Sequence, residues 1–286
     1  MESYYYIKNS RKDYEYLLKK FSNYSCVETN IQRDFIYLNR FNDEQLMKLY
    51  NDYSLKRYQQ EESEIKIFLK VLRWSHEILL YRKQKEYIGN ENATSIIEYC
   101  KSEKVTANCR QHAIVLTEAL LSMGYCARLV CCLPIDVLPY DSHAITAVYS
   151  HELAKWIALD SARNCYFLNE LGEILSVADI RQCLVDNKKI IFKYLHRFTN
   201  LRSGNSYNSL KQFDDIWFLD YLYKNFFRFC CSKINGTTNK VLKYFYHLVP
   251  TGYSEVNTER VFVYENFSNQ ILMNTDDLDM FWQNPN

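Results

Sequence analysis

The chain has 286 residues, 48% of them hydrophobic and 16% aromatic, and its 35 basic and 34 acidic side chains leave a net charge of +1. This length and composition predict a globular protein with a large core, and the presence of only 4 prolines and 6 glycines excludes a disordered or collagen-like chain. Because the charges are balanced and spread along the chain, there is no basic stripe to neutralise phosphates, and we expect no nucleic-acid partner.

No stretch approaches the roughly 18 uncharged apolar residues that a membrane-spanning helix needs. Residues 1–8 also lack the basic and then apolar pattern of an export signal. We therefore expect a cytoplasmic protein with no membrane partner. The 10 cysteines are scattered without the spacing of metal ligands, so we expect no metal and no cofactor, and most of the thiols should be small buried hydrophobes.

The first third of the chain is predicted to be helical. Over 14–58, apolar residues recur at helical spacing, which indicates short helices rich in tyrosine. Residues 61–81 carry an apolar stripe with charged residues off it, as expected for a packed helix. Asn92 can cap a further short helix over 96–101.

The middle of the chain changes from helix to strand. Residues 109–123 have a mostly apolar helical pattern that Gly124 can end. Strand patterns follow at 127–133, 143–149 and 156–160. Ser176 then carries a capping signal for a helix through about residue 185. Toward the C-terminus come an aromatic segment, a turn and two strand-like runs, at 213–229, 235–236, 241–249 and 260–267.

These elements predict one α+β domain over 1–286. We expect a helical extension at 1–60, a core at 61–184 in which the helix over 109–123 packs on an antiparallel sheet, and an aromatic-rich part at 185–286 that packs on the core.

Cys109 stands at the start of the helix over 109–123 and is a candidate nucleophile. A helix N-terminus lowers the pKa of a thiol, but it contributes only about 0.3–1 kcal/mol, so a reactive thiol also needs an adjacent base. His143, at the start of a strand, is the candidate for that base, because the sheet fixes the direction of its side chain.

Asp160, at the end of a strand, is the candidate partner of His143. If residues 151–154 form a four-residue loop, Tyr149 lies opposite Trp156, and His143 lies diagonal to Asp160 on the same sheet face. A loop with an odd number of residues would put the two side chains on opposite faces, so the functional hypothesis depends on this loop.

The motifs that carry these three residues resemble those of the transglutaminase-like family, whose catalytic core is similar to that of papain-like cysteine proteases. They are Asn-Cys-Arg at 108–110 with Gly-Tyr-Cys-Ala-Arg at 124–128, Ser-His-Ala at 142–144, and Trp-Ile-Ala-Leu-Asp at 156–160. The resemblance covers roughly residues 61–184 and includes the family's order of Cys, then His, then Asp.

The resemblance implies a thiol that forms an acyl-thioester. Cys109 would attack a carbonyl, His143 would accept and return the proton, and Asp160 would orient the imidazole. The backbone N–H of Cys109 is a candidate oxyanion donor. The second donor stays open, with Asn108, Gln111 and Trp74 as candidates.

Simpler interpretations exist for these residues. Cys109 could be one more buried cysteine, and His143 a strand residue bonded to backbone. Asp160 could merely begin a turn at Ser161, with Asp136 and Asp141 as substitutes for the carboxylate. Two further residues are candidate substrate contacts: His112, for which a core role is the alternative, and Arg128, for which a structural ion pair is the alternative.

A thiol of this kind can transfer its acyl group to water or to an amine. We expect transfer, because the chain lacks an export signal and its aromatic flanks could exclude water. The partners would then be an acyl donor, namely a peptide, an amide or a carrier-protein thioester of natural-product biosynthesis, and an amine acceptor. A cysteine peptidase or amidase that uses water, and a binding scaffold without catalysis, are the alternatives.

Overall fold

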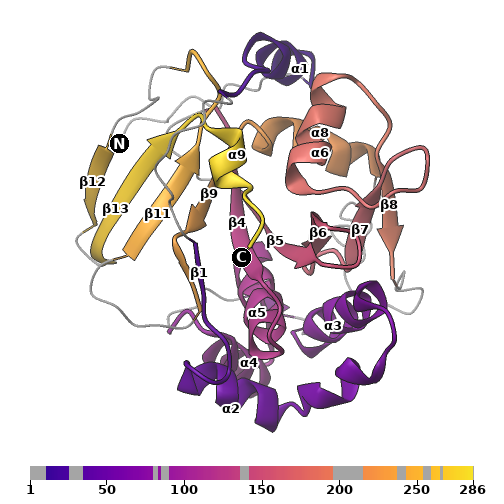
Figure 1. The fold of residues 1–286 in the computed structure, drawn as a ribbon, viewed down its shortest axis with the longest axis vertical. Helices are drawn as coiled ribbons and strands as arrows, with labels where there is room; N and C mark the ends of the chain where they lie inside the picture. The colour runs from indigo at the N-terminus through magenta and orange to yellow at the C-terminus, as the bar shows by residue number, and fades with distance from the viewer. Residues whose placement is uncertain are drawn as a thin grey trace.

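A nine-stranded sheet runs through the middle of the protein (Figure 1). The computed structural model describes residues 11–25, 35–79, 83–84, 90–135, 142–195, 215–236, 243–253, 259–264 and 267–285. The strand order is β12-β13-β11-β9-β4-β5-β6-β7-β8, and all neighbours are antiparallel except β11 and β13, which pair in parallel. The central place of β4 and β5 puts both faces of these two strands in the core.

The strands of this sheet lie between residues 127 and 275. They are β4 (Ala127–Leu133), β5 (His143–Ser150), β6 (Lys155–Asp160), β7 (Cys165–Leu168), β8 (Ile191–Tyr194), β9 (Arg228–Ser232), β11 (Lys243–Leu248), β12 (Glu259–Tyr264) and β13 (Phe267–Thr275). Two short parallel pairs complete the strands: β1 (Ile36–Tyr37) with β10 (Ile234–Asn235), and β2 (Lys83–Gln84) with β3 (Val105–Thr106).

Helices cover both faces of the sheet (Figure 1). One face packs against the helices α2 (Glu44–Asp52), η1 (Leu55–Gln60), α3 (Glu64–Ile78), α4 (Ala93–Glu103) and α5 (Cys109–Ser122). The other packs against α1 (Arg11–Lys20), α6 (Val177–Val185) and α8 (Asp215–Asn225), while α9 (Leu278–Phe281) lies near β11 and the C-terminus. No helix in the described ranges is long and apolar enough to cross a bilayer.

The helix α5 has strong start and stop signals. Asn108 and Gln111 form a capping box, in which each side chain accepts a hydrogen bond from the other residue's backbone N–H. Gly124 follows the helix with φ of +97°, a left-handed conformation that favours glycine. Between these ends every residue from 111 to 122 is buried, so α5 is fixed both by its caps and by its packing.

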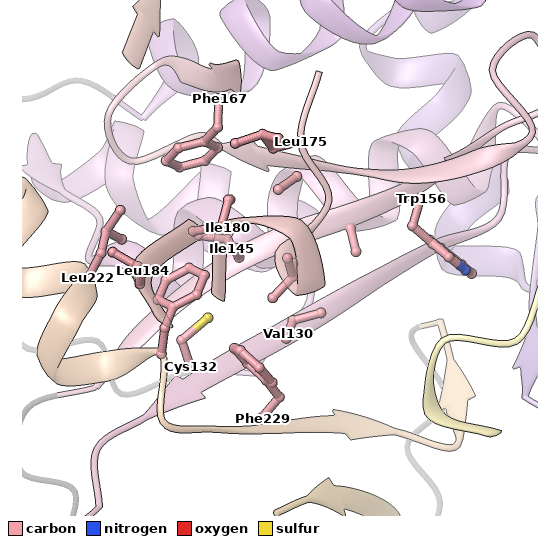
Figure 2. Close-up of a cluster of buried hydrophobic side chains, with 14 of the residues drawn as sticks. Val130, Cys132, Ile145, Trp156, Phe167, Leu175, Ile180, Leu184, Leu222 and Phe229 are labelled. Atoms are coloured by element: carbon pink, nitrogen blue, oxygen red, sulfur yellow. The ribbon is translucent and has the colours of Figure 1, made fainter. Parts of the chain in front are cut away.

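Two apolar cores lie on the two faces of the sheet. Beneath α5, the residues Ala127, Val148 and Leu159 of the sheet meet the apolar side chains of α3, α4 and α5. The other core is shown in Figure 2 and contains Val130, Cys132, Ile145, Trp156, Phe167, Leu175, Ile180, Leu184, Leu222 and Phe229. Alternate residues of each strand therefore serve different cores, as the period of a strand requires.

The predicted α+β class is confirmed, and so is the packing of the helix that begins at Cys109 on a mainly antiparallel sheet. The sequence did not predict the strands β1, β2, β3, β7, β8, β9, β10 and β13, and the run at 260–267 corresponds to β12. Because β8, β9, β11, β12 and β13 join the same sheet as β4–β6, the predicted boundary near residue 184 is not a boundary of the sheet.

Glu118 generates a prediction about the pH dependence of stability. Its carboxylate is buried on α5 and accepts the backbone N–H of Ala93 at 2.7 Å. Burial raises the pKa of Glu118 from 4.5 to about 8, so between these pH values the native state binds a proton that the unfolded chain has lost. We expect the free energy of unfolding to fall by a few kcal/mol as pH rises from about 5 to about 8. Glu118→Gln, which keeps the acceptor, should reduce this fall.

Urea unfolding of both proteins across this pH range measures the effect. An equal pH dependence in the wild type and in Glu118→Gln would contradict a native state that holds Glu118 protonated.

Candidate active site

Cys109 is the first residue of α5, and its thiol is half-buried against the start of β5. The sulfur lies 3.8 Å from the carbonyl oxygen of Ser142 and accepts the backbone N–H of Ala144. The capping box at Asn108 sets the direction of the helix start, so the helix and the strand together position the thiol.

His143 is the first residue of β5 and joins the thiol to a carboxylate. Its Nε2 lies 2.8 Å from Oδ2 of Asp160, and its ring also hydrogen-bonds the Cys109 side chain. Because Nε2 is used by Asp160, Nδ1 is the nitrogen left for the thiol. The side chains of Cys109, His143 and Asp160 thus form one row.

The register of β5 and β6 puts His143 and Asp160 together. Tyr149 is opposite Trp156 and Ser150 is opposite Lys155, so residues 151–154 form the four-residue turn that the hypothesis required. The predicted register is confirmed. The side chains of His143 and Asp160 lie on the same sheet face, as diagonal neighbours.

Asp160 has no exposed surface, and both of its carboxylate oxygens have partners. Oδ2 meets His143, and Oδ1 accepts the backbone N–H of Arg163 at 3.1 Å. The residue therefore also begins a turn, as the simpler interpretation proposed, and the turn fixes the carboxylate that holds the imidazole.

The electrostatics of the row favour a charged pair. Burial raises the pKa of Cys109, but the His143 side chain and the Ala144 N–H outweigh burial, and the pKa of the thiol is lowered. Burial lowers the pKa of His143, but Asp160 and Cys109 raise it to about 9. Burial also raises the pKa of Asp160, but the neighbouring His143 outweighs burial, and the pKa of Asp160 is lowered. The site is therefore suited to a thiolate beside an imidazolium.

Aromatic side chains of α8 cover His143. The ring of Tyr221 lies edge-on to the imidazole at 5.4 Å between centroids, and Phe218 lies at 6.1 Å. The hydroxyl of Tyr221 donates to the carbonyl oxygen of Ser142 at 3.0 Å. Sequence reasoning assigned this aromatic segment to packing. Nothing in its pattern indicates that it lies against a histidine far earlier in the chain.

The proposed oxyanion groups lie in different environments. The backbone N–H of Cys109 belongs to the first turn of α5. The side-chain amide oxygens of Asn108 and Gln111 are engaged in the capping box. Trp74 is buried in α3 and packs against Tyr53, and no hydrogen bond or ring contact found among the described residues joins it to the row. The second oxyanion donor stays a prediction.

His112 lies in a buried polar cluster rather than in the row. Its Nδ1 is 3.4 Å from Oγ of Ser161, and its ring faces that of His76 at 5.6 Å. His76 Nδ1 lies 2.7 Å from the carbonyl oxygen of Ser161, and the Ser75 and Ser161 hydroxyls are 2.8 Å apart. Burial lowers the pKa of His112 to about 3, so the ring is neutral. This placement favours the core role over substrate contact.

The proposed contact between Arg128 and substrate does not fit the structure. Arg128 is completely buried, its guanidinium stacks on Trp156 at 3.9 Å and Phe35 at 4.2 Å, and Nη1 and Nη2 donate to the carbonyl oxygens of Phe281 and Gln283. The guanidinium of Arg128 therefore holds the C-terminal segment at residues 281–283, a contact that the spacing of residues in the sequence does not reveal. The predicted alternative, a structural ion pair, is also not what the described residues show, because the partners of Arg128 are backbone carbonyl oxygens and aromatic rings rather than a carboxylate.

Other candidate residues add little to the site. The substitute carboxylates Asp136 and Asp141 lie outside the described residues. Within the described part of the chain, no group of His, Cys, Asp or Glu side chains could hold a metal ion.

A helix-borne thiol beside a sheet-borne imidazole and carboxylate is the arrangement of the papain-like class of cysteine enzymes. Residues 53–161 match the sequence model of the transglutaminase-like superfamily, a similarity that is consistent with cysteine-dependent catalysis. No curated protein matches the chain.

Two solved structures are similar. One is a proposed cysteine protease from Cytophaga hutchinsonii, with 15% identity, a TM-score of 0.31, and coverage of 55% of this chain and 53% of the other. The second is Legionella pneumophila LapG in an EGTA-treated form, with 16% identity, a TM-score of 0.27, and coverage of 59% and 75%. This chain therefore spans about half the length of the Cytophaga protein.

The charged pair predicts a characteristic pH profile for alkylation of Cys109. An isolated cysteine thiol has a pKa of about 8.5, whereas Cys109 beside His143 should react with iodoacetamide well below that pH. His143→Asn should move the profile toward the ordinary thiol, because the imidazolium that stabilises the thiolate is lost. Cys126→Ala removes another half-buried thiol and should leave the profile unchanged. Peptide-resolved alkylation rates measure this, and equal profiles for wild type and His143→Asn would refute the pair.

Arg128→Met tests the structural role of Arg128. The substitution removes the donors to Phe281 and Gln283 and the stacking on Trp156, so we expect a loss of about 2–4 kcal/mol in the free energy of unfolding. Urea unfolding measures the loss, and the alkylation profile of Cys109 should stay the same. Unchanged stability would contradict the structural assignment.

Proposed function

We propose that the protein is an acyltransferase in which Cys109 forms an acyl-thioester and passes the acyl group to an amine. The observation that carries this proposal is the row of Cys109, His143 and Asp160, with His143 hydrogen-bonded to both neighbours. The match of residues 53–161 to the transglutaminase-like superfamily supports cysteine-dependent catalysis.

In the first half-reaction, the Cys109 thiolate attacks the carbonyl carbon of the donor. The tetrahedral oxyanion accepts a hydrogen bond from the backbone N–H of Cys109. The imidazolium of His143 gives its proton to the leaving group as the carbonyl reforms. The products are the acyl-thioester and the protonated leaving group.

In the second half-reaction, an amine attacks the thioester carbonyl. His143 accepts the proton of the amine, the amide bond forms, and Cys109 leaves as the thiolate. Asp160 stays ionised throughout and orients the imidazole, because its second oxygen is held by the Arg163 N–H.

The environment of the row supports an amine over water as the acceptor. The rings of Tyr221 and Phe218 cover His143, and the thiol itself is only half-buried. A bound amine can react with an effective molarity of up to about 10⁵–10⁸ M, which outweighs bulk water where water access is restricted. A carrier-protein thioester is the donor that we would test first.

Intact-mass spectrometry after mixing the protein with an acyl thioester tests the proposal. Wild type should gain one acyl group, and an added amine should remove it as an amide. Cys109→Ala should lose both the adduct and the turnover, the latter by at least about 10⁴-fold. Cys126→Ala, which alters a half-buried thiol outside the row, should keep both.

Release of free acid at the same rate with and without amine would rule out transfer and identify a hydrolase. Failure of every donor, together with a Cys109 that does not react with iodoacetamide, would identify a scaffold without catalysis. Turnover that survives Cys109→Ala would overturn the proposal as a whole.

A further inference from the structure

Two further cysteines lie beside the proposed nucleophile. Cys131 of β4 is directly opposite Ala144 of β5 on one side and Cys230 of β9 on the other. Residues directly opposite each other in an antiparallel sheet project from the same face. Since Ala127 and Leu129 of β4 belong to the core beneath α5, Cys131 and Cys230 also project toward the face that carries α5.

Cys109 approaches this pair through Ala144. Its sulfur accepts the backbone N–H of Ala144, the residue beside Cys131 in the sheet, and Ala144 presents only a methyl group on that face. None of the three cysteines, Cys109, Cys131 and Cys230, forms a disulfide, and each is half-buried. Cys131 and Cys230 therefore lie side by side on β4 and β9, and Cys109, at the start of α5, lies next to Ala144 on the neighbouring strand β5.

The side chain of Arg110 links α5 to Cys131. Its Nη1 lies 3.6 Å from the Cys131 sulfur, and Glu91 holds the guanidinium with two bonds of 2.7 and 2.8 Å. Burial raises the pKa of Cys131, and Arg110 acts against this. A fixed cation beside a thiol favours the thiolate when it attacks.

We propose that Cys131 is a resolving thiol for Cys109 and that Cys230 completes a relay, so that oxidation of Cys109 by a hydroperoxide ends as a Cys131–Cys230 disulfide. Directly opposed antiparallel residues have Cα atoms about 4.5–5.5 Å apart, within the range of about 4.4–6.8 Å that a disulfide requires. The sheet register therefore provides the geometry for the final bond.

Each step of the relay balances. The Cys109 thiolate attacks a peroxide oxygen and becomes a sulfenic acid, and hydroxide (or an alcohol from an organic hydroperoxide) leaves. The Cys131 thiolate attacks that sulfur, which forms the 109–131 disulfide and releases hydroxide. The Cys230 thiolate then attacks the Cys131 sulfur, which forms the 131–230 disulfide and returns Cys109 as a thiolate. The peroxide is the oxidant, and the 131–230 pair supplies the electrons.

The relay goes beyond the proposed acyl transfer. It needs a reactive thiolate at Cys109 but no acyl donor or acceptor. It would return Cys109 to the reduced state before further oxidation to sulfinic or sulfonic acid, which thiols do not reverse.

The test treats the reduced full-length protein with one equivalent of hydrogen peroxide, blocks free thiols with N-ethylmaleimide, and maps peptides without reductant. In wild type we expect a 131–230 disulfide and a free Cys109. In Cys230→Ser the relay should stop at the 109–131 disulfide, with Cys109 recovered by dithiothreitol. In Cys131→Ser, one equivalent should leave Cys109 as a sulfenic acid, and its labelling by dimedone, added with the peroxide, should rise at least about tenfold over wild type.

Cys126→Ser is the matched control, because Cys126 is also half-buried but precedes β4, at the opposite end of that strand from Cys131. It should behave as wild type. The iodoacetamide reactivity of Cys109 before peroxide, equal in all four proteins, establishes that each variant is folded around an intact site.

Two results overturn the relay. Cys109 that reacts with iodoacetamide and peroxide, but is labelled by dimedone equally in wild type and Cys131→Ser, overturns the relay alone and leaves the proposed acyl transfer unaffected. Disulfides that form only between molecules do the same. Cys109 that reacts with neither reagent overturns the relay and the proposed function together.

Discussion

The hydrogen bond between His143 and Asp160 is the interaction on which the geometry of the candidate site depends. It joins two completely or nearly buried side chains from neighbouring strands, and it leaves the other imidazole nitrogen for Cys109. A buried charged pair is costly to separate, since removal of one partner of such a pair typically costs about 3–5 kcal/mol. The site is therefore stable only if the strand register, the turn after Asp160 and the cover above His143 are all in place.

Burial and pairing act in opposite directions at each of the three groups. Burial alone would raise the pKa of Cys109 and Asp160 and lower that of His143, which would favour three neutral groups. The neighbours reverse each direction, so the charged forms are favoured inside the protein. At Glu118 the neighbours do not reverse the effect of burial. A single backbone N–H does not offset burial, and the carboxyl group is held protonated near neutral pH.

The C-terminal part of the chain is joined to the site through the sheet. The strand β9 pairs with β4, which brings Cys230 next to Cys131, and α8 places Tyr221 over His143. Arg128 fastens the last residues to the centre of the sheet through the carbonyl oxygens of Phe281 and Gln283. Residues more than a hundred positions apart thus share one environment around the thiol.

The sequence by itself determined the local features of this protein. Asn108 and Gln111 cap α5, Gly124 ends it, and the short, mostly apolar runs at 143–149 and 156–160 give the strands that carry His143 and Asp160. These features depend on neighbours within a few residues or on one short turn, so their patterns are visible in the chain. Only the tertiary structure decided the burial of Arg128, the cover by Tyr221 and the alignment of Cys131 with Cys230. Those contacts join distant segments whose pairing depends on the whole sheet, and no local pattern encodes it.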